Sequence, residues 1–337
     1  MIIIERAVLH LLDTDHHEKV LSTNELPLDS LTNTFLLPHL EKCLRKQSGK
    51  RGRFYQNSAF QTLLLEYMNK TIDFIAFSTQ IASNWYDLLM QAQDMPSSVL
   101  FVCDLTVEER RQIALLRPAN HTGFIHQMRA SDAGCVSTTI QNETALLPSP
   151  GQSIDEFVFI DMASHEILLS AKRYTIEGSS LLALPEALLE CDPSPSPQEA
   201  LQVLQKTAGK VAESFGEDPV KTAALVKTAL AEELQEKEAL KPMAIGQAIF
   251  GRQPDMQAAM EKELREGGWE TVAPIVFDKN AALKKLLHHK LKTDTGIELT
   301  VPVEYFDNTE YMEFHKAEDG SLSITLKHIT NLTNRTS

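Results

Sequence analysis

The sequence lacks any long uncharged apolar run. A helix that crosses a membrane needs about 18 to 20 such residues in succession, and none occurs. The opening segment MIIIERAVLHLLD is apolar, but Glu5 and Arg6 interrupt it and no small-residue cleavage site follows. We therefore expect no membrane contact, no signal peptide and a location in the cytoplasm.

Cysteine is also scarce. The four cysteines of the 337-residue chain stand singly, without C-x-x-C spacing. Disulfide frameworks and zinc sites need clustered cysteines, so we expect idle thiols in a reducing compartment at Cys43, Cys103, Cys135 and Cys191.

The common chemical motifs are missing. The chain contains no G-x-G-x-x-G, G-x-x-x-x-G-K-[ST], H-E-x-x-H, G-x-S-x-G or EF-hand loop. Adjacent carboxylates such as Glu108 and Glu109 point in different directions on a regular element, and the His16-His17 and His288-His289 pairs have no Cys or carboxylate at i+3 or i+4. We expect a non-enzymatic protein with no catalytic residue, cofactor or metal site.

The composition is that of a folded globular protein, with 43% hydrophobic and 23% charged residues. The length favours two or three folding units. The formal net charge is −14, so the chain as a whole repels polyphosphate. Binding to nucleic acid therefore requires a local exception.

The periodicity predicts an α+β fold with three parts. Residues 1–191 should form a mixed α/β domain: a first strand near 1–12, helical stripes at 60–68 and 74–88, and short apolar strands from Ser97 onward that pair largely antiparallel. Leu31 to Leu44 has helical spacing, but Pro38 predicts a kink or two shorter helices there.

Residues 192–278 should form a small helical module after the linker DPSPSP. Ser196, Pro197 and Glu199 fit a capping box with proline in the first turn. Further helices should run from Pro219 to about Lys241 and from Pro254 to Arg265.

Residues 279–337 should form a C-terminal β-rich segment. Apolar and polar residues alternate in it, and Asp319-Gly320 predicts a hairpin turn, so the segment should be an antiparallel sheet with one dry face. The residues assigned to the core are Ile297, Leu299, Phe314, Leu322 and Ile324.

Two windows oppose the global charge. The first, KCLRKQSGKRGR, carries +6 and the second, Lys279 to Lys292, carries +5, on a chain of −14, which leaves −25 for the remainder. Arginine forks and lysine ammonium groups bind phosphate, and glycines let backbone approach it. A solvated basic loop is the plain alternative for each window. The candidate DNA-binding residues are Lys42, Arg45, Lys46, Lys50, Arg51, Arg53, Lys284, Lys285, Lys290 and Lys292.

Three separated blocks carry a resemblance. The opening IIIERAVLHLLD, the central FIDMASHEILLSAKRYTIEGSSLLALPEALLECDPSPSPQEA and the closing TGIELTVPVEYFDNTEYMEFHKAEDGSLSITLKHITNLTNR together resemble the bacterial 37-kDa nucleoid-associated protein family, and the mass of 37.7 kDa agrees. The resemblance implies a cytoplasmic protein of the nucleoid, with no established catalytic activity and no catalytic residues to map.

Two functional hypotheses follow. In the first, the protein contacts double-stranded DNA through its backbone, without sequence specificity, using local basic surfaces on an acidic body. In the second, an acidic adaptor or DNA mimic reaches the nucleoid by binding a DNA-handling protein. A metal-dependent nuclease is a third, disfavoured by the missing motifs. The stripes of the helical module fit a homodimer interface or packing within one chain equally, and the sequence leaves both open.

Overall fold

The computed structural model divides the chain into two compact units, unit 1 (Met1–Ser194) and unit 2 (Pro195–Ser337). The division falls within DPSPSP. Separation of residues 279–337 from the helical module stays a prediction. The structure describes residues 1–46, 48–93, 96–130, 136–150, 152–217, 219–237, 239–272, 274–306, 308–316 and 322–331.

Unit 1 is built on an eight-stranded sheet of order β12-β3-β9-β8-β5-β4-β1-β2. All of its neighbouring strands pair antiparallel, which confirms the α+β class. The strands are β1 (Ile2–Asp13), β2 (Glu18–Val20), β3 (Lys50–Phe54), β4 (Ser98–Val107), β5 (Arg110–Arg117), β8 (Glu156–Asp161), β9 (Ile167–Ser170) and β12 (Cys191–Pro193). Smaller elements are β10 (Tyr174–Ile176), β11 (Ser179–Leu181) and η1 (Leu184–Leu188).

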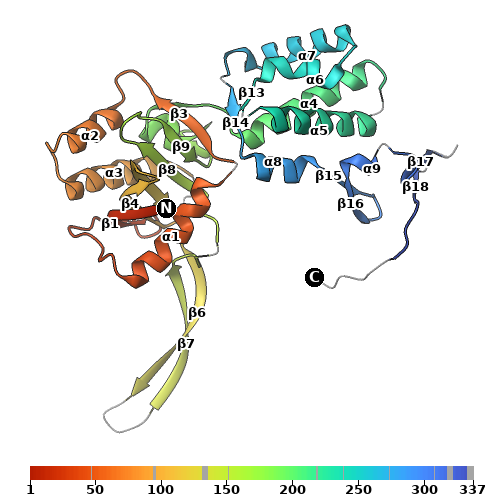
Figure 1. Ribbon diagram of the computed structural model, residues 1–337. Helices are drawn as coiled ribbons and strands as arrows, with labels where there is room; N and C mark the ends of the chain where they lie inside the picture. Colours follow the sequence, from red (N-terminus) through yellow and green to blue (C-terminus); the bar gives the residue numbers. More distant parts are fainter. Residues whose placement is uncertain are drawn as a thin grey trace. The chain divides into compact units, whose positions relative to one another are not determined.

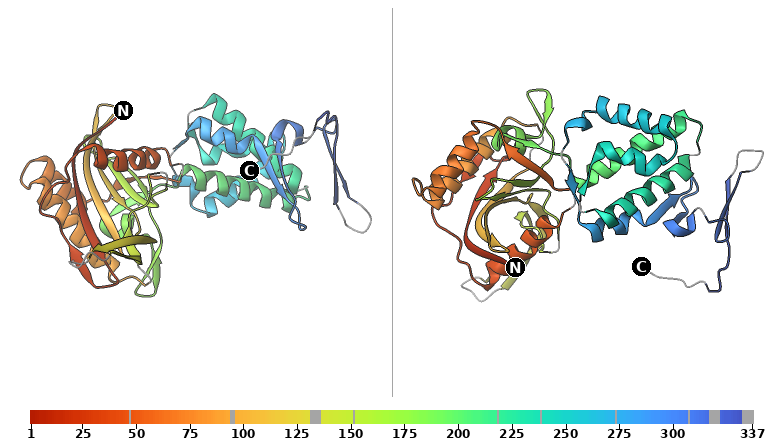
Figure 2. Two further views of the ribbon diagram at one scale, coloured as in Figure 1. Left: turned by 90° about the horizontal axis from the view of Figure 1, so that it is seen from below. Right: turned by 45° about the horizontal axis from the view of Figure 1, so that its top comes forward.

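Helices cover both faces of this sheet (Figures 1 and 2). Phe101 and Cys103 of β4 belong to the core beneath one helix, while Leu100 and Val102 belong to the core beneath two others. Burial on both faces explains why SSVLFVCDL is a continuous apolar run rather than an alternating one. The single helix is α1 (Ser30–Leu44), and the pair is α2 (Ala59–Met68) and α3 (Phe74–Leu89).

The prediction of two helices around Pro38 is wrong. Helix α1 runs from Ser30 to Leu44 with Pro38 inside it. Proline removes one backbone donor and costs the helix stability, but Leu36 and Leu40 on either side of it are fully buried against the sheet. Tertiary packing therefore outweighs the local penalty.

A long β-ribbon leaves unit 1. Strands β6 (His121–Ala130) and β7 (Val136–Leu146) pair with each other as a separate two-stranded sheet. Figure 1 shows them extending away from the main sheet. The sequence predicts β6 as a strand in a largely antiparallel domain and does not indicate which strand pairs with it.

Unit 2 begins with helices that pack around one core. The predicted capping box is confirmed, with Ser196 Oγ accepting from the backbone N–H of Glu199, and Glu199 Oε2 accepting from the N–H of Ser196. The second helix ends at Glu236, earlier than predicted, because a short strand follows it. The elements are α4 (Pro197–Ser214), α5 (Pro219–Glu236), β13 (Ala239–Leu240), η2 (Pro242–Ala244), α6 (Ile245–Phe250), α7 (Pro254–Glu266), η3 (Trp269–Thr271), β14 (Ile275–Val276) and α8 (Lys279–Leu286).

The C-terminal segment forms two separate ribbons, not one sheet. They are β15 (His288–Lys292) with β16 (Glu298–Pro302), and β17 (Met312–Lys316) with β18 (Leu322–Leu326); α9 (Val303–Phe306) lies between the ribbons in sequence.

The core assignments in these ribbons hold only in part. Leu299, Phe314 and Ile324 pack on a small core that includes Ala224 of α5. Ile297 is 58% exposed, so its assignment to the core is wrong: it precedes β16, outside the alternating pattern. The side chain of Leu322 and the turn at Asp319-Gly320 lie outside the described residues.

A buried histidine couples the stability of unit 1 to pH. His10 of β1 is fully buried; its Nδ1 accepts a hydrogen bond from the backbone N–H of Ser22 at 3.1 Å, and its Nε2 has no partner among the described residues. Burial lowers the pKa of His10 to about 4. The pKa of His39, also buried, is lowered for the same reason.

We therefore predict that unit 1 loses stability as the pH falls below 6.5. The unfolded chain binds the proton at the ordinary histidine pKa whereas the folded chain does not, so by pH 5 His10 alone should cost about 2 kcal/mol of unfolding free energy. Urea unfolding at pH 7.5 and pH 5 measures the loss. In His10→Asn, which keeps an acceptor near the Nδ1 position, the loss should shrink by that amount; an unchanged pH dependence would contradict the assignment.

Candidate nucleic-acid interface

The first basic window spans the end of α1 and all of β3 except Phe54. Arg51 and Arg53 are exposed, and Gly52 between them is buried, as expected of alternating positions on a strand. Arg51 is paired with Leu168 of β9, a residue of the core beneath α1. Because cross-strand partners share a face, the strand presents its arginines on the face that α1 covers.

The glycines of this window are structural. A Cβ on Gly49 would lie 2.9 Å from Leu168 Cδ1, and one on Gly52 would lie 3.1 Å from the carbonyl oxygen of Asp192. Both glycines therefore let neighbouring protein segments approach closely. The sequence interpretation, in which they admit a phosphate, stays a prediction.

Acidic side chains engage Lys46 and Arg53 of this window. Lys46 is partly buried; its Nζ lies 3.6 Å from Asp155 Oδ1, donates to the carbonyl of Ile154 at 3.0 Å, and sits 5.6 Å from the ring centroid of Phe157. The Arg53 side chain is 85% exposed, and its Nη2 lies 4.0 Å from Glu166 Oε1, a long distance for an ion pair. Lys46 is thus held by contacts within unit 1, whereas most of the Arg53 side chain is exposed to solvent.

Arg45 and Arg51 are the most available cations of the window. Both are exposed, and within the described part of the chain neither forms an ion pair. Lys42 is exposed and Lys50 is half-buried. Lys42 and Arg45 also stand at the C-terminal end of α1, where positive charge stabilises the helix dipole. That role leaves the guanidinium of Arg45 exposed.

The sequence reasoning missed a base that the fold brings to this surface. Lys172 follows β9, the strand that pairs with β3, and is exposed. Lys172 Nζ lies 3.1 Å from Asp155 Oδ2. Burial opposes ionisation of Asp155, but the hydrogen bond and charge of Lys172, together with Lys46, hold the pKa of that carboxyl below its usual value. The dipeptide Lys172-Arg173 is the sequence feature that could have indicated this base.

The second window is divided between two elements. Lys279, Lys284 and Lys285 lie on α8, and Lys290 and Lys292 lie on β15; the side chains of Lys284 and Lys285 are outside the described part. Lys292 stands directly opposite Glu298 on β16, with Nζ 3.1 Å from Oε1. Lys290 is exposed opposite Thr300. This window is therefore weaker than its sequence charge indicates.

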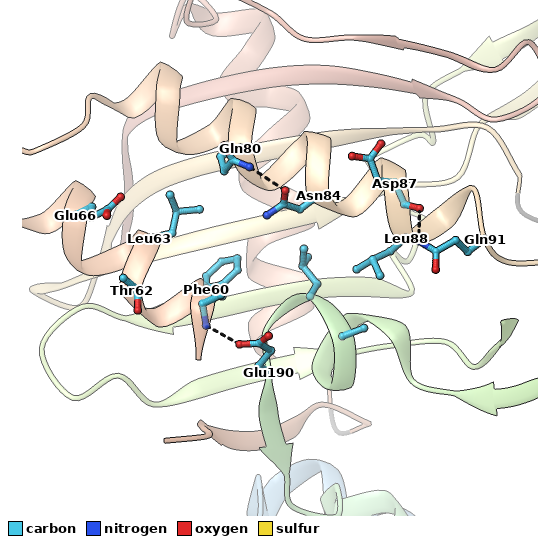
Figure 3. A pocket seen from close by; sticks show the side chains of 13 residues that line it. Phe60, Thr62, Leu63, Glu66, Gln80, Asn84, Asp87, Leu88, Gln91 and Glu190 are labelled. Atoms are coloured by element: carbon cyan, nitrogen blue, oxygen red, sulfur yellow. Dashed lines mark hydrogen bonds between the residues drawn. The ribbon is translucent and has the colours of Figure 1, made fainter. Parts of the chain in front are cut away.

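A groove of about 570 Å³ lies between α2, α3 and η1 (Figure 3). Leu63 and Leu88 provide apolar surface, and Glu66, Asp87 and Glu190 are acidic. Its lining includes no lysine or arginine, so the groove repels phosphate. Asp87 accepts from Lys19 at 2.9 Å, and Glu190 accepts from the N–H of Ala59 at the start of α2.

The described ranges show neither a metal centre nor a membrane-spanning helix. In the ranges that the structure describes, no group of three or more His, Cys, Asp or Glu side chains could hold a metal ion. Over those same ranges, no helix has the length and apolarity to cross a membrane.

Fold and charge define an acidic two-unit α+β protein. The model of the nucleoid-associated protein YejK family matches residues 8–333. The chain therefore belongs to that family of nucleoid-associated proteins, as the resemblance of its three sequence blocks predicts. A search of the curated proteins finds no match.

Proposed function

We propose that this chain contacts the DNA backbone, without reading its sequence and without catalysis, through the surface that carries Arg45 and Arg51. The observation that carries the proposal is that these two guanidinium groups are exposed and unpaired in the described part of an acidic chain. Exposed arginines bind phosphate oxygens in fixed geometry. Membership of a nucleoid-associated family supports the same role.

The acidic body limits how strong this contact is. A net charge of −14 repels a polyphosphate at long range. Binding must come from a short footprint in which the basic side chains touch phosphates directly. We infer weak, salt-sensitive binding that is indifferent to sequence, because phosphate contacts position a protein without specifying bases.

Salt dependence tests this proposal. If all six bases of the first window contact phosphates, the slope of log affinity against log salt should be about −5. If only the four exposed bases do, the slope should be about −4; these are Lys42, Arg45, Arg51 and Arg53. Fluorescence anisotropy with several unrelated duplexes, at salt concentrations between about 20 and 200 mM, measures this slope. Absence of binding in dilute buffer, or binding that ignores salt, would overturn the proposal.

A second function is favoured by the groove between α2 and α3. Apolar surface at Leu63 and Leu88 beside the carboxylate of Glu66 suits an amphipathic helix with basic residues, as a DNA-handling protein could offer. Capture from nuclease-treated lysate separates the two functions. A partner lost on Glu66→Lys but kept on Arg51→Glu supports the adaptor; a partner that vanishes with the DNA argues against it.

A further inference from the structure

The ribbon β6–β7 has one apolar face. Cross-strand pairing places Phe124 opposite Asn142, His126 opposite Ile140, and Met128 opposite Thr138. Since side chains alternate along a strand and paired residues share a face, these six lie together. The other face carries Ile125, Gln127, Thr139 and Gln141.

The large residues of the apolar face are strongly exposed. Phe124 is 80%, Ile140 80% and Met128 68% accessible. An isolated two-stranded ribbon is marginally stable in water, and contiguous exposed apolar surface marks an interaction site. This face therefore needs a covering partner.

Charge argues that the partner is not nucleic acid. Residues 121–146 include one arginine, Arg129, against Asp132 and Glu143, which gives a net charge of −1. The described side chains of the apolar face carry no lysine or arginine. A ribbon that lies along DNA has to neutralise phosphates, and this one cannot.

The pattern of the face is self-complementary. Two ribbons can stack face to face about a twofold axis. This axis lies in the interface, runs perpendicular to the strands and passes through the His126–Ile140 row. Phe124 of each copy then covers Met128 of the other, and the two Ile140 side chains meet. Stacking about an axis along the strands would instead cover Phe124 with Asn142. We propose that a second copy of this chain covers the ribbon in the first, antiparallel arrangement.

The size of the face sets the expected strength. A ribbon about 33 Å long and about 10 Å wide offers less area than the roughly 800 Å² per partner of a standard interface. The dimer should therefore be reversible, with a dissociation constant of about 1 to 100 μM. Symmetric use of one patch closes the assembly at two copies.

Substitution of one residue on each face tests the proposal. Sedimentation velocity across protein concentration should show a monomer–dimer equilibrium in the unaltered chain. Ile140→Glu should weaken dimerisation at least about tenfold, because it buries two carboxylates against each other. Thr139→Glu, the next residue on the same strand and on the opposite face, adds the same charge and should leave the equilibrium unchanged.

Cross-linking identifies the register. Stacked sheets lie about 10 Å apart, which is too far for the Cα separation of a disulfide, so a short bismaleimide is the suitable reagent. In a Cys135→Ser background, whose other cysteines are buried, Ile140→Cys should cross-link to a covalent dimer and Thr139→Cys should not.

Each remaining outcome overturns the proposal. A monomer at all concentrations means that another segment or no partner covers the ribbon, and a dimer that survives Ile140→Glu is formed elsewhere. If Ile140→Glu lowers DNA affinity while the mass stays monomeric, the ribbon is a nucleic-acid arm. The salt slope that tests DNA binding is measured separately, so either proposal can fail alone.

Discussion

Glu156→Gln should lower the unfolding free energy of unit 1 by about 3 to 5 kcal/mol, because it leaves the buried guanidinium of Arg117 without its counter-charge. Arg117 and Glu156 are 7% and 2% exposed as residues and form an ion pair between β5 and β8. Arg117 also donates to Ser98 Oγ at 2.9 Å, to the Tyr174 hydroxyl at 2.9 Å and to the carbonyl of Pro96 at 3.2 Å. The network satisfies the guanidinium fully only while the carboxylate is charged.

Fluorescence can isolate this effect. Trp85 belongs to unit 1 and Trp269 to unit 2, so urea unfolding in a Trp269→Phe background follows unit 1 alone. A matched control within unit 1 is Glu25→Gln, which breaks the exposed pair of Arg6 and Glu25 and should cost less than about 1 kcal/mol. A cost below about 1 kcal/mol for Glu156→Gln would contradict the expected effect.

Replacing both partners of the buried pair should restore much of the loss. In Arg117→Met with Glu156→Met, no charge remains buried, and apolar replacements of a buried pair are often nearly neutral. The double variant should therefore be more stable than Glu156→Gln, although Tyr174 loses a partner.

Arg45→Glu with Arg51→Glu should weaken DNA binding roughly 60-fold at 0.1 M salt. The estimate follows from two lost phosphate contacts, each of which contributes about 0.9 to the slope of log affinity against log salt, and the slope itself should flatten by about 2. Both side chains are exposed, so the fold should be unaffected. Repulsion by the new carboxylates adds to the loss.

The control for net charge lies in unit 2. Lys206 and Lys262 are exposed on α4 and α7, and reversing both changes the total charge by the same amount as the arginine pair does. If this control weakens binding equally, the effect is one of net charge and the surface at Arg45 and Arg51 has no special role. The adaptor function predicts partner capture that neither pair of substitutions disturbs.

Local signals in the sequence predicted local structure well. The capping box at Ser196 and the stripes of α2 and α3 depend on residues three or four positions apart, whose interactions belong to a single element. The continuous apolar run of β4 likewise reflects burial on both faces of its own strand. The fold class followed from such features, whereas the family followed from the resemblance of three separated sequence blocks.

What the sequence could not supply is pairing between distant segments. β3 lies between β9 and β12, which are more than about a hundred residues later in the chain, so neither the packing of Gly52 against Asp192 nor the arrival of Lys172 could be foreseen. Asp155, the partner of Lys46, also comes from a distant segment of the chain. The departure of β6 from the main sheet was hidden for a similar reason, since alternation does not say which strand is the neighbour.

The position of β3 in the sheet also bears on how the protein matures. Its two neighbours, β9 and β12, emerge from the ribosome long after β3 does, and β12 is the last strand of unit 1. At about 5 to 20 residues per second, the cationic strand waits many seconds for its flanking strands. Until β9 is made, β3 has neither of its pairing partners, and only complete synthesis of unit 1 fixes its arginines in place.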